Sequence, residues 1–536
     1  TTEALEVDET PQARSKLRIA SILVALYLVL FISALDQTIV ATSIPTICAA
    51  LHSASGYTWI GGAYLLANAA TGPIWTRCSD IWGRKPALLS AVAIFGIASI
   101  IAALSTSMRM LIAARALQGT AGGGLIQMVY ITISDLFSMR RRALHFGLMG
   151  LIWAVAGTTG PLIGGALTQL ATWRWCFWLN LPVCGAALTL LTLFLDVHNP
   201  RTSLSHGLKA IDWPGTACLL AVSLLLLLGL DLGGASYPWS SARIISLLAA
   251  GTFMAAVFLY TQHRLSKYPL LPLHLFQSNR TTLLAPLALG FAHSMVALGT
   301  EYYLPLYFQA VQQASPLRSG LLLLPLMLTE AATDILVGVL IHRTGRYREI
   351  VWAGAALLTL GTALLTLLDV DTPLARVFGL QVLAALGTAC LFQTPMLAVQ
   401  NSVSPAEAAS ATATLGFVRN LATALSVVLG GVIFQNGMQA RQAGLAALGI
   451  QGDVLKALSG EAAAANVGIV RMIRDERQRR AVRDAFAGSL RVMFAFYAGV
   501  AGVTVVGAAF VKQRRLATEH TEVKTGVQHL RERGGD

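Results

Sequence analysis

TRCSDIWGRK, residues 76–85, places an acid, a glycine and three bases between two apolar runs at 56–75 and 86–104. GVLIHRTGRY, residues 338–347, repeats its pattern, which is G-x-L-x-D-R-x-G-R-K/Y. Thr76 stands at the leading glycine of the first copy, and His342 stands at the acid of the second. Both copies fit a short charged loop at a membrane face. Two copies in equivalent loops predict a chain made of two related halves, as in many transporters.

The composition is that of a polytopic membrane protein. The 536 residues are 55% hydrophobic and 12% charged, with a mean hydropathy of +0.64, whereas a soluble chain is about 25% charged. The net charge of +13 comes from bases between the apolar runs, which is a pattern of membrane topology rather than of nucleic-acid binding. The six cysteines show no paired spacing, so the sequence predicts neither a disulfide framework nor a metal site.

Fourteen stretches are long and apolar enough to cross a membrane, since a spanning helix needs about 20 residues. This all-α prediction places them at 17–47, 56–75, 86–104, 110–136, 142–169, 176–197, 211–232, 242–263, 281–309, 316–342, 350–368, 374–399, 406–434 and 490–511. The first stretch is too long for a cleavable signal peptide and contains an acid, so it is expected to be a span. The segments 1–16 and 512–536 are expected to be tails, the first of them disordered.

The charges between the spans predict the topology. Bases cluster in the segments 77–85, 140–142, 201–209, 264–280 and 342–348, and the intervening segments carry fewer. Cytosolic loops are enriched in Lys and Arg, so both termini are expected in the cytosol. The expected location is the plasma membrane, with the vacuolar membrane as the alternative.

One long loop, 435–489, is expected on the outer side. Its apolar residues recur at helical spacing with arginines between them: Ile469, Ile473, Val482, Phe486 and Leu490. This pattern predicts an amphipathic helix that lies on the outer membrane face.

Asp36 and Arg115 are charged residues inside predicted spans. A charge at the membrane centre costs roughly 2.5–3.5 kcal/mol on insertion scales, so such residues are retained for a reason. The two helices run in opposite directions and place both residues at a similar depth, where they could pair. A carboxylate near an arginine can release and regain a proton as its solvation changes. The alternative is a static clamp between two helices.

Glu330 and Asp334 lie one helical turn apart on one face of the predicted span 316–342. Two carboxylates so close in a low dielectric are not expected to be ionised together, so the pair is a candidate proton carrier. Arg419 is expected at the depth of Glu330 as its partner, and Glu301 in span 281–309 is a further candidate. The alternative is a buried salt bridge that only fixes packing.

The span 142–169 is rich in small residues. Small residues let helices approach closely, and a proline bends a helix, so the segment is expected to be a tightly packed, bent helix that prevents leakage. Ordinary close packing is the alternative. The residues are Gly157, Gly160, Pro161, Gly164 and Gly165. Amides and aromatics inside other spans are candidates to line a substrate cavity, although each alone is more typical of packing: Asn68, Gln118, Gln127, Trp153, Phe291 and Gln393.

Several short motifs follow one another in a fixed order. They are LDQTIVATSIP at 35–45, the loop Asp80…Gly83-Arg84-Lys85, RALQG at 115–119, GP and GG at 160–165, WRW and NLP at 173–182, DW at 212–213 and YLPLYFQ at 303–309. Together they resemble the fourteen-helix drug:proton antiporters of the major facilitator superfamily, especially fungal toxin and multidrug efflux pumps. The resemblance covers residues 17–511.

The resemblance implies two six-helix bundles, at 17–197 and 281–511, with two inserted helices within 198–280. It also implies alternating access around a central cavity. Arg115 would serve proton coupling, and Gly160-Pro161 would be the antiporter motif. The charged loop would latch the halves together when the outside is open, through Asp80, Gly83, Arg84, Lys85, Asp135 and Arg140, with Arg343, Gly345 and Arg346 in the second copy. Because His342 replaces the second acid, this latch is expected to be one-sided.

The leading hypothesis is therefore a monomeric, proton-coupled antiporter that exports hydrophobic or amphipathic small molecules from a lipid bilayer without a cofactor. Vacuolar import of basic amino acids is the alternative within the family, since it needs acids at the cavity. A transport-inactive nutrient receptor is a third hypothesis. The sequence has no G-x-x-x-x-G-K-S/T loop for ATP-driven export and no nucleophile–base pair for a membrane enzyme.

Overall fold

The computed structural model describes residues 15–40, 42–51, 56–197, 200, 202–233, 237–266, 269–270, 273, 280–450, 452–459 and 462–518. The regular secondary structure of these residues is helical, apart from one isolated bridge between Gly233 and Tyr237. The expected tail residues 1–14 and 519–536 lie outside the described part.

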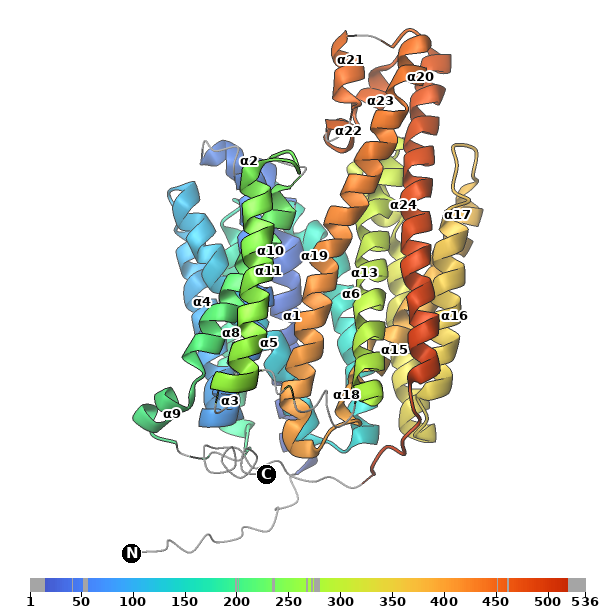
Figure 1. The fold of residues 1–536 in the computed structure, drawn as a ribbon. Helices are drawn as coiled ribbons and strands as arrows, with labels where there is room; N and C mark the ends of the chain where they lie inside the picture. Colours follow the sequence, from blue (N-terminus) through green and yellow to red (C-terminus); the bar gives the residue numbers. More distant parts are fainter. Residues whose placement is uncertain are drawn as a thin grey trace, which may run out of the picture.

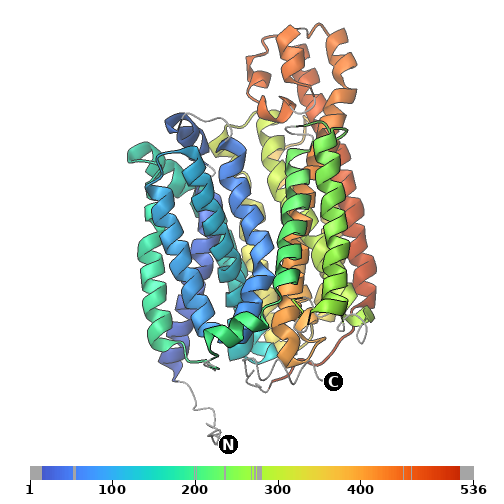
Figure 2. The same ribbon diagram turned by 60° about the vertical axis from the view of Figure 1, so that its left-hand side comes forward.

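Two groups of helices form the two halves of the molecule, and a helical pair connects them (Figures 1 and 2). The N-terminal half comprises α1 (Lys16–Ile39), α2 (Ile44–Ala50), α3 (Gly56–Trp82), α4 (Arg84–Ala103), α5 (Met108–Leu136), α6 (Met139–Leu170), α7 (Trp175–Trp178) and α8 (Asn180–Phe194). The connecting segment comprises α9 (Leu204–Ala210), α10 (Trp213–Leu232), α11 (Ala242–Tyr260) and the π-helical turn η1 (Thr261–Leu265).

The C-terminal half follows the connecting pair. It comprises α13 (Arg280–Ala310), α14 (Pro316–Leu321), α15 (Leu324–Thr344), α16 (Arg348–Leu365), α17 (Leu374–Phe392), α18 (Thr394–Gln400), η2 (Pro405–Glu407), α19 (Ala408–Ala440), α20 (Gln442–Ala447), α21 (Gly452–Ala457), α22 (Ala462–Ala465), α23 (Ile469–Met472) and α24 (Glu476–Phe510). We call the face where α1 begins and α24 ends the terminal face (Figure 1).

Twelve helical segments of the described chain are long and apolar enough to cross a membrane. The other two predicted spans correspond to α3 and α5, which are long helices inside the bundle but less apolar. Their polar residues face each other and the helices around them, so they do not need a lipid-facing composition. The count of fourteen spans therefore stays a prediction.

The connecting helices lie at the seam between the halves. α10 packs against both α3 and α19, and Leu228 of α10 contacts the small apolar cluster formed by Leu66 and Ala69 of α3. Leu421 of α19 joins the same cluster. The two halves are thus bridged by a helix that belongs to neither.

The halves are held together near the terminal face. Gln400 of α18 donates a 2.8 Å hydrogen bond to Ser134 of α5 and accepts a 3.3 Å one from Arg142 of α6. His342 of α15 lies 3.1 Å from the carbonyl oxygen of Arg140. α19 packs against α3 and α5 of the N-terminal half and leans away from that half toward the opposite face (Figure 1). The structure therefore has its terminal side closed.

The stretch 76–85 is helical rather than a loop, which corrects the sequence prediction. α3 runs through Thr76 to Trp82, and α4 begins at Arg84. Only Gly83 breaks the helix, with φ of +95°, and Gly345 ends α15 in the second copy with φ of +69°. Both turns need the positive φ that glycine adopts without strain.

The prediction of a helix lying on the outer membrane face is wrong. Residues 476–489 are the first turns of α24, which continues without a break into the predicted span. Val482 and Phe486 are fully buried, and the Phe486 ring lies 5.7 Å from that of Phe434 in α19. The apolar repeat therefore packs against protein, and α20 to α23 cap the two extended helices (Figure 1).

Four other predicted spans are interrupted. The span 176–197 is divided into α7 and α8 at Leu179. α1 ends at Ile39, and a short α2 follows. The span 316–342 consists of α14 and α15, and the span 374–399 breaks at Gln393 between α17 and α18. In the last two cases a proline stands in the first turn of the new helix. Because proline has no N–H to donate to the preceding turn, the helix is interrupted there.

Candidate functional site

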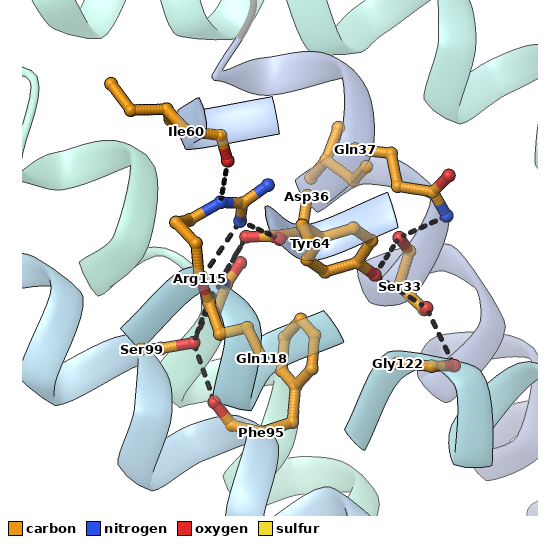
Figure 3. A network of polar contacts seen from close by, with 12 residues as sticks. Ser33, Asp36, Gln37, Ile60, Tyr64, Phe95, Ser99, Arg115, Gln118 and Gly122 are labelled. Atoms are coloured by element: carbon orange, nitrogen blue, oxygen red, sulfur yellow. Dashed lines mark hydrogen bonds and ion pairs between the residues drawn. The ribbon is translucent and has the colours of Figure 1, made fainter. Parts of the chain in front are cut away.

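Asp36 of α1 and Arg115 of α5 form an ion pair in the N-terminal half, at the meeting point that their depth predicted (Figure 3). Both side chains are almost completely buried. Gln118 and Asn180 donate to the second oxygen of Asp36 at 3.3 and 3.0 Å. Every part of the carboxylate is thereby compensated, as a buried charge requires.

The guanidinium of Arg115 is fixed on several sides. Its Nε donates to the carbonyl of Ile60 at 3.1 Å, and an Nη donates to Gln118 at 3.0 Å. The Tyr64 ring lies 4.5 Å from the guanidinium carbon, within cation–π range. Ser99 accepts from Gln118 at 2.8 Å (Figure 3). Arginine suits this place since its planar group serves several partners at once.

Glycines of α5 bring α3 close enough to build this network. A Cβ at Gly119 would overlap the backbone carbonyl of Tyr64, and one at Gly123 would overlap the carbonyl of Asn68. Asn68 is buried between these helices rather than lying at the interface of the halves. The motif at 115–119 therefore contains both the buried charge of Arg115 and the glycine, Gly119, that lets α3 pack closely over it.

The acids of the C-terminal half lie on the interior side of α15. Leu328, Leu336 and Leu340 form its exposed stripe. Glu330 and Asp334 are each two positions away from this stripe, which is about 200° around a helix. Asp334 is 4% exposed, and its Oδ1 has no hydrogen-bond partner. Glu330 is half-buried and lies within Coulombic range of Asp334 and of Glu301 in α13.

Arg419 of α19 has a different partner from the one predicted. It donates to the backbone carbonyl of Phe392, at the break between α17 and α18, and lies 5.6 Å from the Phe392 ring. Among the ion pairs of the described residues, none joins Arg419 to Glu330. Asp334 is the acid within its Coulombic range. The predicted partner of Arg419 was the acid Glu330. In the structure its partner is instead the carbonyl of Phe392, which the helix break leaves without a helical hydrogen bond.

The six predicted cavity residues do not gather in one place. Gln118 belongs to the Asp36 network. Gln127 and Gln393 lie where α5 meets the C-terminal half: Gln393 donates to Tyr130 at 3.5 Å, and Gln127 faces Gly416 of α19. Each of these two amides keeps one buried atom without a partner, Nε2 of Gln127 and Oε1 of Gln393. Trp153 and Phe291 are half-buried against the apolar core.

The predicted latch acts within the N-terminal half in this structure. Arg84 donates to Asp80 and to Asp135, each at 2.7 Å, and all three are at least mostly buried. Lys85 donates to the carbonyl of Thr192 in α8 at 2.8 Å. These contacts join α3, α4, α5 and α8, so the expectation that they tie the two halves together is corrected.

The second copy of the charged stretch does meet the other half. The guanidinium of Arg140 lies beside Gly345, close enough for a Cβ there to come within 2.6 Å. Arg343 and Arg346 are exposed, and Arg346 reaches Glu349 at 3.9 Å. Arg140 is therefore the member of the predicted latch that bridges the halves.

Only part of the glycine-rich segment of α6 is needed for packing. A Cβ at Gly160 would overlap the Thr38 side chain, and one at Gly164 would overlap the carbonyl of Ile39. Nothing lies near a Cβ at Gly157 or Gly165. α1 and α6 are thus held in close contact by Gly160 and Gly164 beside Pro161, whose carbonyl accepts from Thr42 at 3.4 Å.

Comparison with known proteins decides the family. A family model described as the Major Facilitator Superfamily matches residues 26–427. The chain is a member of this superfamily. The MFS-type transporter ppz2 of Metarhizium majus is 42% identical to it over 96% of this chain and 88% of that protein. The efflux pump dotC of Dothistroma septosporum is 40% identical over 95% and 87%, and the efflux pump FUS6 of Gibberella fujikuroi is 36% identical over 81% and 78%.

Solved structures show the same fold. The human organic anion transporter MFSD10 superposes with a TM-score of 0.55 and 18% identity, over 90% of this chain and 99% of that one. The proton:xylose symporter XylE gives 0.54 and 14%, over 88% and 99%. At these identities the likeness concerns the fold alone, which is the two-bundle fold that the sequence predicted.

No sequence pattern assigned a role to several residues that build these sites in this facilitator. Asn180 and Ser99 complete the Asp36 network, and Gln400 joins the halves. Asn180 stands in the NLP motif, which was a usable signal. Gly147 and Gly150 of α6 lie against Asp334, and only their helical spacing of three could have indicated a shared face.

Proposed function

We propose that this facilitator is a proton-coupled antiporter that exports hydrophobic or amphipathic small molecules by alternating access. The observation that carries the proposal is the presence of buried carboxylates in both halves. Asp36 is paired with Arg115, while Asp334 has no ion-pair partner among the described residues. Buried acids inside spans are costly and are a usual means of proton transfer in transporters. The relatives named as fungal efflux pumps support export as the direction.

The proposal includes an orientation of the protein in the membrane. The terminal face carries the base-rich segments, so it is the cytosolic face by the positive-inside rule. With both ends of the described chain on one face, the number of spans is even, which agrees with fourteen. The plasma membrane is the proposed location and a monomer the proposed state.

Roles for the motifs follow from this orientation. Asp80, Arg84 and Asp135 would hold the cytosolic ends of α3, α4 and α5 as one body that moves as a unit. The close contact of α1 with Gly160 and Gly164 would keep the N-terminal half sealed during exchange. Gln127 and Gln393, with their unpartnered buried atoms between the halves, would meet the polar groups of the substrate.

Import of basic amino acids is kept as a second function because of one observation. Glu301 and Glu330 are half-buried acids that lie within Coulombic range of each other near the interior of the C-terminal half. Such a pair could hold a cationic amino group as well as a proton. The membrane would then be vacuolar.

The test is substrate-dependent proton flux in proteoliposomes with an imposed pH gradient. The panel contains lipophilic cations, neutral toxins, lysine and arginine. Flux with amphipathic compounds that is lost in Asp36→Asn or Glu330→Gln supports the antiporter. Flux with lysine or arginine alone moves the protein to the second function. Substrate binding without flux, in folded wild-type protein, contradicts both and favours a receptor.

A further inference from the structure

α6 and α15 come from different halves and touch backbone to backbone. A Cβ at Gly147 of α6 would lie 2.5 Å from the carbonyl oxygen of Asp334. A Cβ at Gly338 of α15 would lie 2.7 Å from the carbonyl oxygen of Ala143. Small residues on both helices therefore make the closest contact between the halves possible.

The carboxylate of Asp334 occupies the space beside Gly150. A Cβ at Gly150 would lie 2.6 Å from the carboxyl carbon of Asp334, so no larger residue fits while the halves are closed. The carboxylate of one half thus packs directly against the glycine backbone of the other half, and we call its place beside Gly150 the seat. Opening the terminal side must lift the carboxylate from this place.

The seat suits a neutral carboxyl group better than a charged one. Asp334 is 4% exposed, and its Oδ1 has no hydrogen-bond partner. The neighbouring Arg419 is engaged by the carbonyl of Phe392. An unpaired buried carboxylate costs several kcal/mol, whereas its protonated form avoids most of that penalty.

The titratable groups around Asp334 come from four helices. Arg419 of α19, Tyr130 of α5 and Cys390 of α17 lie within Coulombic range of it, as does Glu330 on its own helix. α6 presents glycine backbone to the carboxylate. Arg419 is the one basic group of this set, and Glu330 is the one other carboxyl group.

We infer that Asp334 couples proton binding to the closing of the two halves. The protonated side chain sits beside Gly150 while the terminal side is closed; when α6 separates from α15, the side chain leaves this place and loses its proton on the terminal side, and the charged form does not fit back beside Gly150. The inference rests on the proposed antiporter function and names the residue that links the proton to the conformational change. Glu301 and Glu330, each within range of the next, provide the proton route from the interior to Asp334.

The distance between the halves at the terminal face tests this link without any substrate. Spin labels are placed at the exposed positions Arg141 of α6 and Thr344 of α15, in full-length protein whose six cysteines are replaced. Distances are measured in nanodiscs between pH 5 and pH 9. Wild type is expected to shift from a short to a long distance as pH rises. Asp334→Asn is expected to keep the short distance at all pH values.

Further variants separate the role of Asp334 from a general effect. Asp196→Asn changes an exposed acid and is expected to leave the pH response intact. Gly150→Ala fills the seat and is expected to favour the long distance at all pH values, and the added change Asp334→Ala is expected to restore closure without a pH response. Gly185→Ala in α8, where a Cβ meets open space, is expected to change nothing.

The outcomes distinguish this inference from the proposed function. A pH response in Asp334→Asn equal to that of wild type overturns the inference, even where wild type shows proton-driven flux. Absence of flux in wild type, with a pH-dependent distance that Asp334→Asn abolishes, overturns the antiporter and leaves Asp334 as a proton-linked switch.

Discussion

At the scale of single residues, the N-terminal site differs from the C-terminal one in how its charge is compensated. Asp36 receives an ion pair and two hydrogen bonds, while Asp334 has no partner for one oxygen. A fully compensated pair is costly to disturb, and an uncompensated acid is ready to change its protonation state. Besides its proposed part in proton coupling, the first suits an anchor between α1 and α5, and the second suits a switch.

Loss of Arg115 tests the anchor. We expect Arg115→Ala to lower the free energy of unfolding by about 3–5 kcal/mol, because it leaves the buried Asp36 without its charge partner. The double variant Asp36→Asn with Arg115→Gln should recover most of the loss, since neither residue is then charged. Thermal unfolding of the purified protein in detergent measures both. Equal loss in the single and double variants would contradict the argument.

Much of the N-terminal site could be predicted from sequence, whereas the C-terminal interface could not. Opposed helix directions were enough to bring Asp36 to Arg115. The seat of Asp334 depends on which face of α15 meets α6, and no local pattern fixes that. Arg419 shows the same limit, because its partner is a backbone carbonyl freed by a helix break at Gln393. The spacing of residues predicts which side chains share a helix face. It does not predict which backbone carbonyls lack a helical hydrogen bond and can accept one from a side chain.

At the scale of helices, the contact between α1 and α6 depends on two of the four predicted glycines. We expect Gly160→Val to cost about 1–3 kcal/mol or more through overpacking against Thr38. Gly165→Ala should change stability by less than about 0.5 kcal/mol, because its Cβ meets open space. Thermal midpoints of the two variants give the comparison. Equal effects would mean that the four glycines act by helix flexibility rather than by contact.

The upper turns of α24 give a second test at this scale. Phe486 is fully buried against Phe434, so Phe486→Ala is expected to cost about 3–5 kcal/mol by leaving a cavity. Val492 is 50% exposed on the same helix, and Val492→Ala should be nearly neutral. The comparison is made by thermal unfolding in detergent. If Phe486→Ala left the stability unchanged, the result would contradict this packing and would support the predicted amphipathic helix on the membrane surface.

At the scale of the whole molecule, the segment after α24 ties the terminal face together. Gln513 accepts from the backbone N–H groups of Tyr347 and Arg348, at 3.3 and 3.0 Å, and donates to the carbonyl of Gly345 at 3.2 Å. Further on, the carbonyl of Ala517 accepts a 3.4 Å hydrogen bond from the backbone N–H of Arg140 in the other half. The segment 511–518 thus crosses from one half to the other while the terminal side is closed.

Removal of these contacts is expected to favour the open terminal side. Each hydrogen bond contributes about 0.5–1.5 kcal/mol, and 1.4 kcal/mol is a tenfold change in an equilibrium. Gln513→Ala frees the segment whose Ala517 carbonyl accepts from Arg140, so it should raise the population with a long distance between labels at Arg141 and Thr344 by up to about tenfold. Lys512→Ala is the matched control, since Lys512 contacts Tyr347 through its backbone carbonyl and its side chain is exposed. If both variants keep the wild-type distances, closure is set by the contacts of α5 and α6 with the C-terminal half, and the segment 511–518 only follows the movement of the halves.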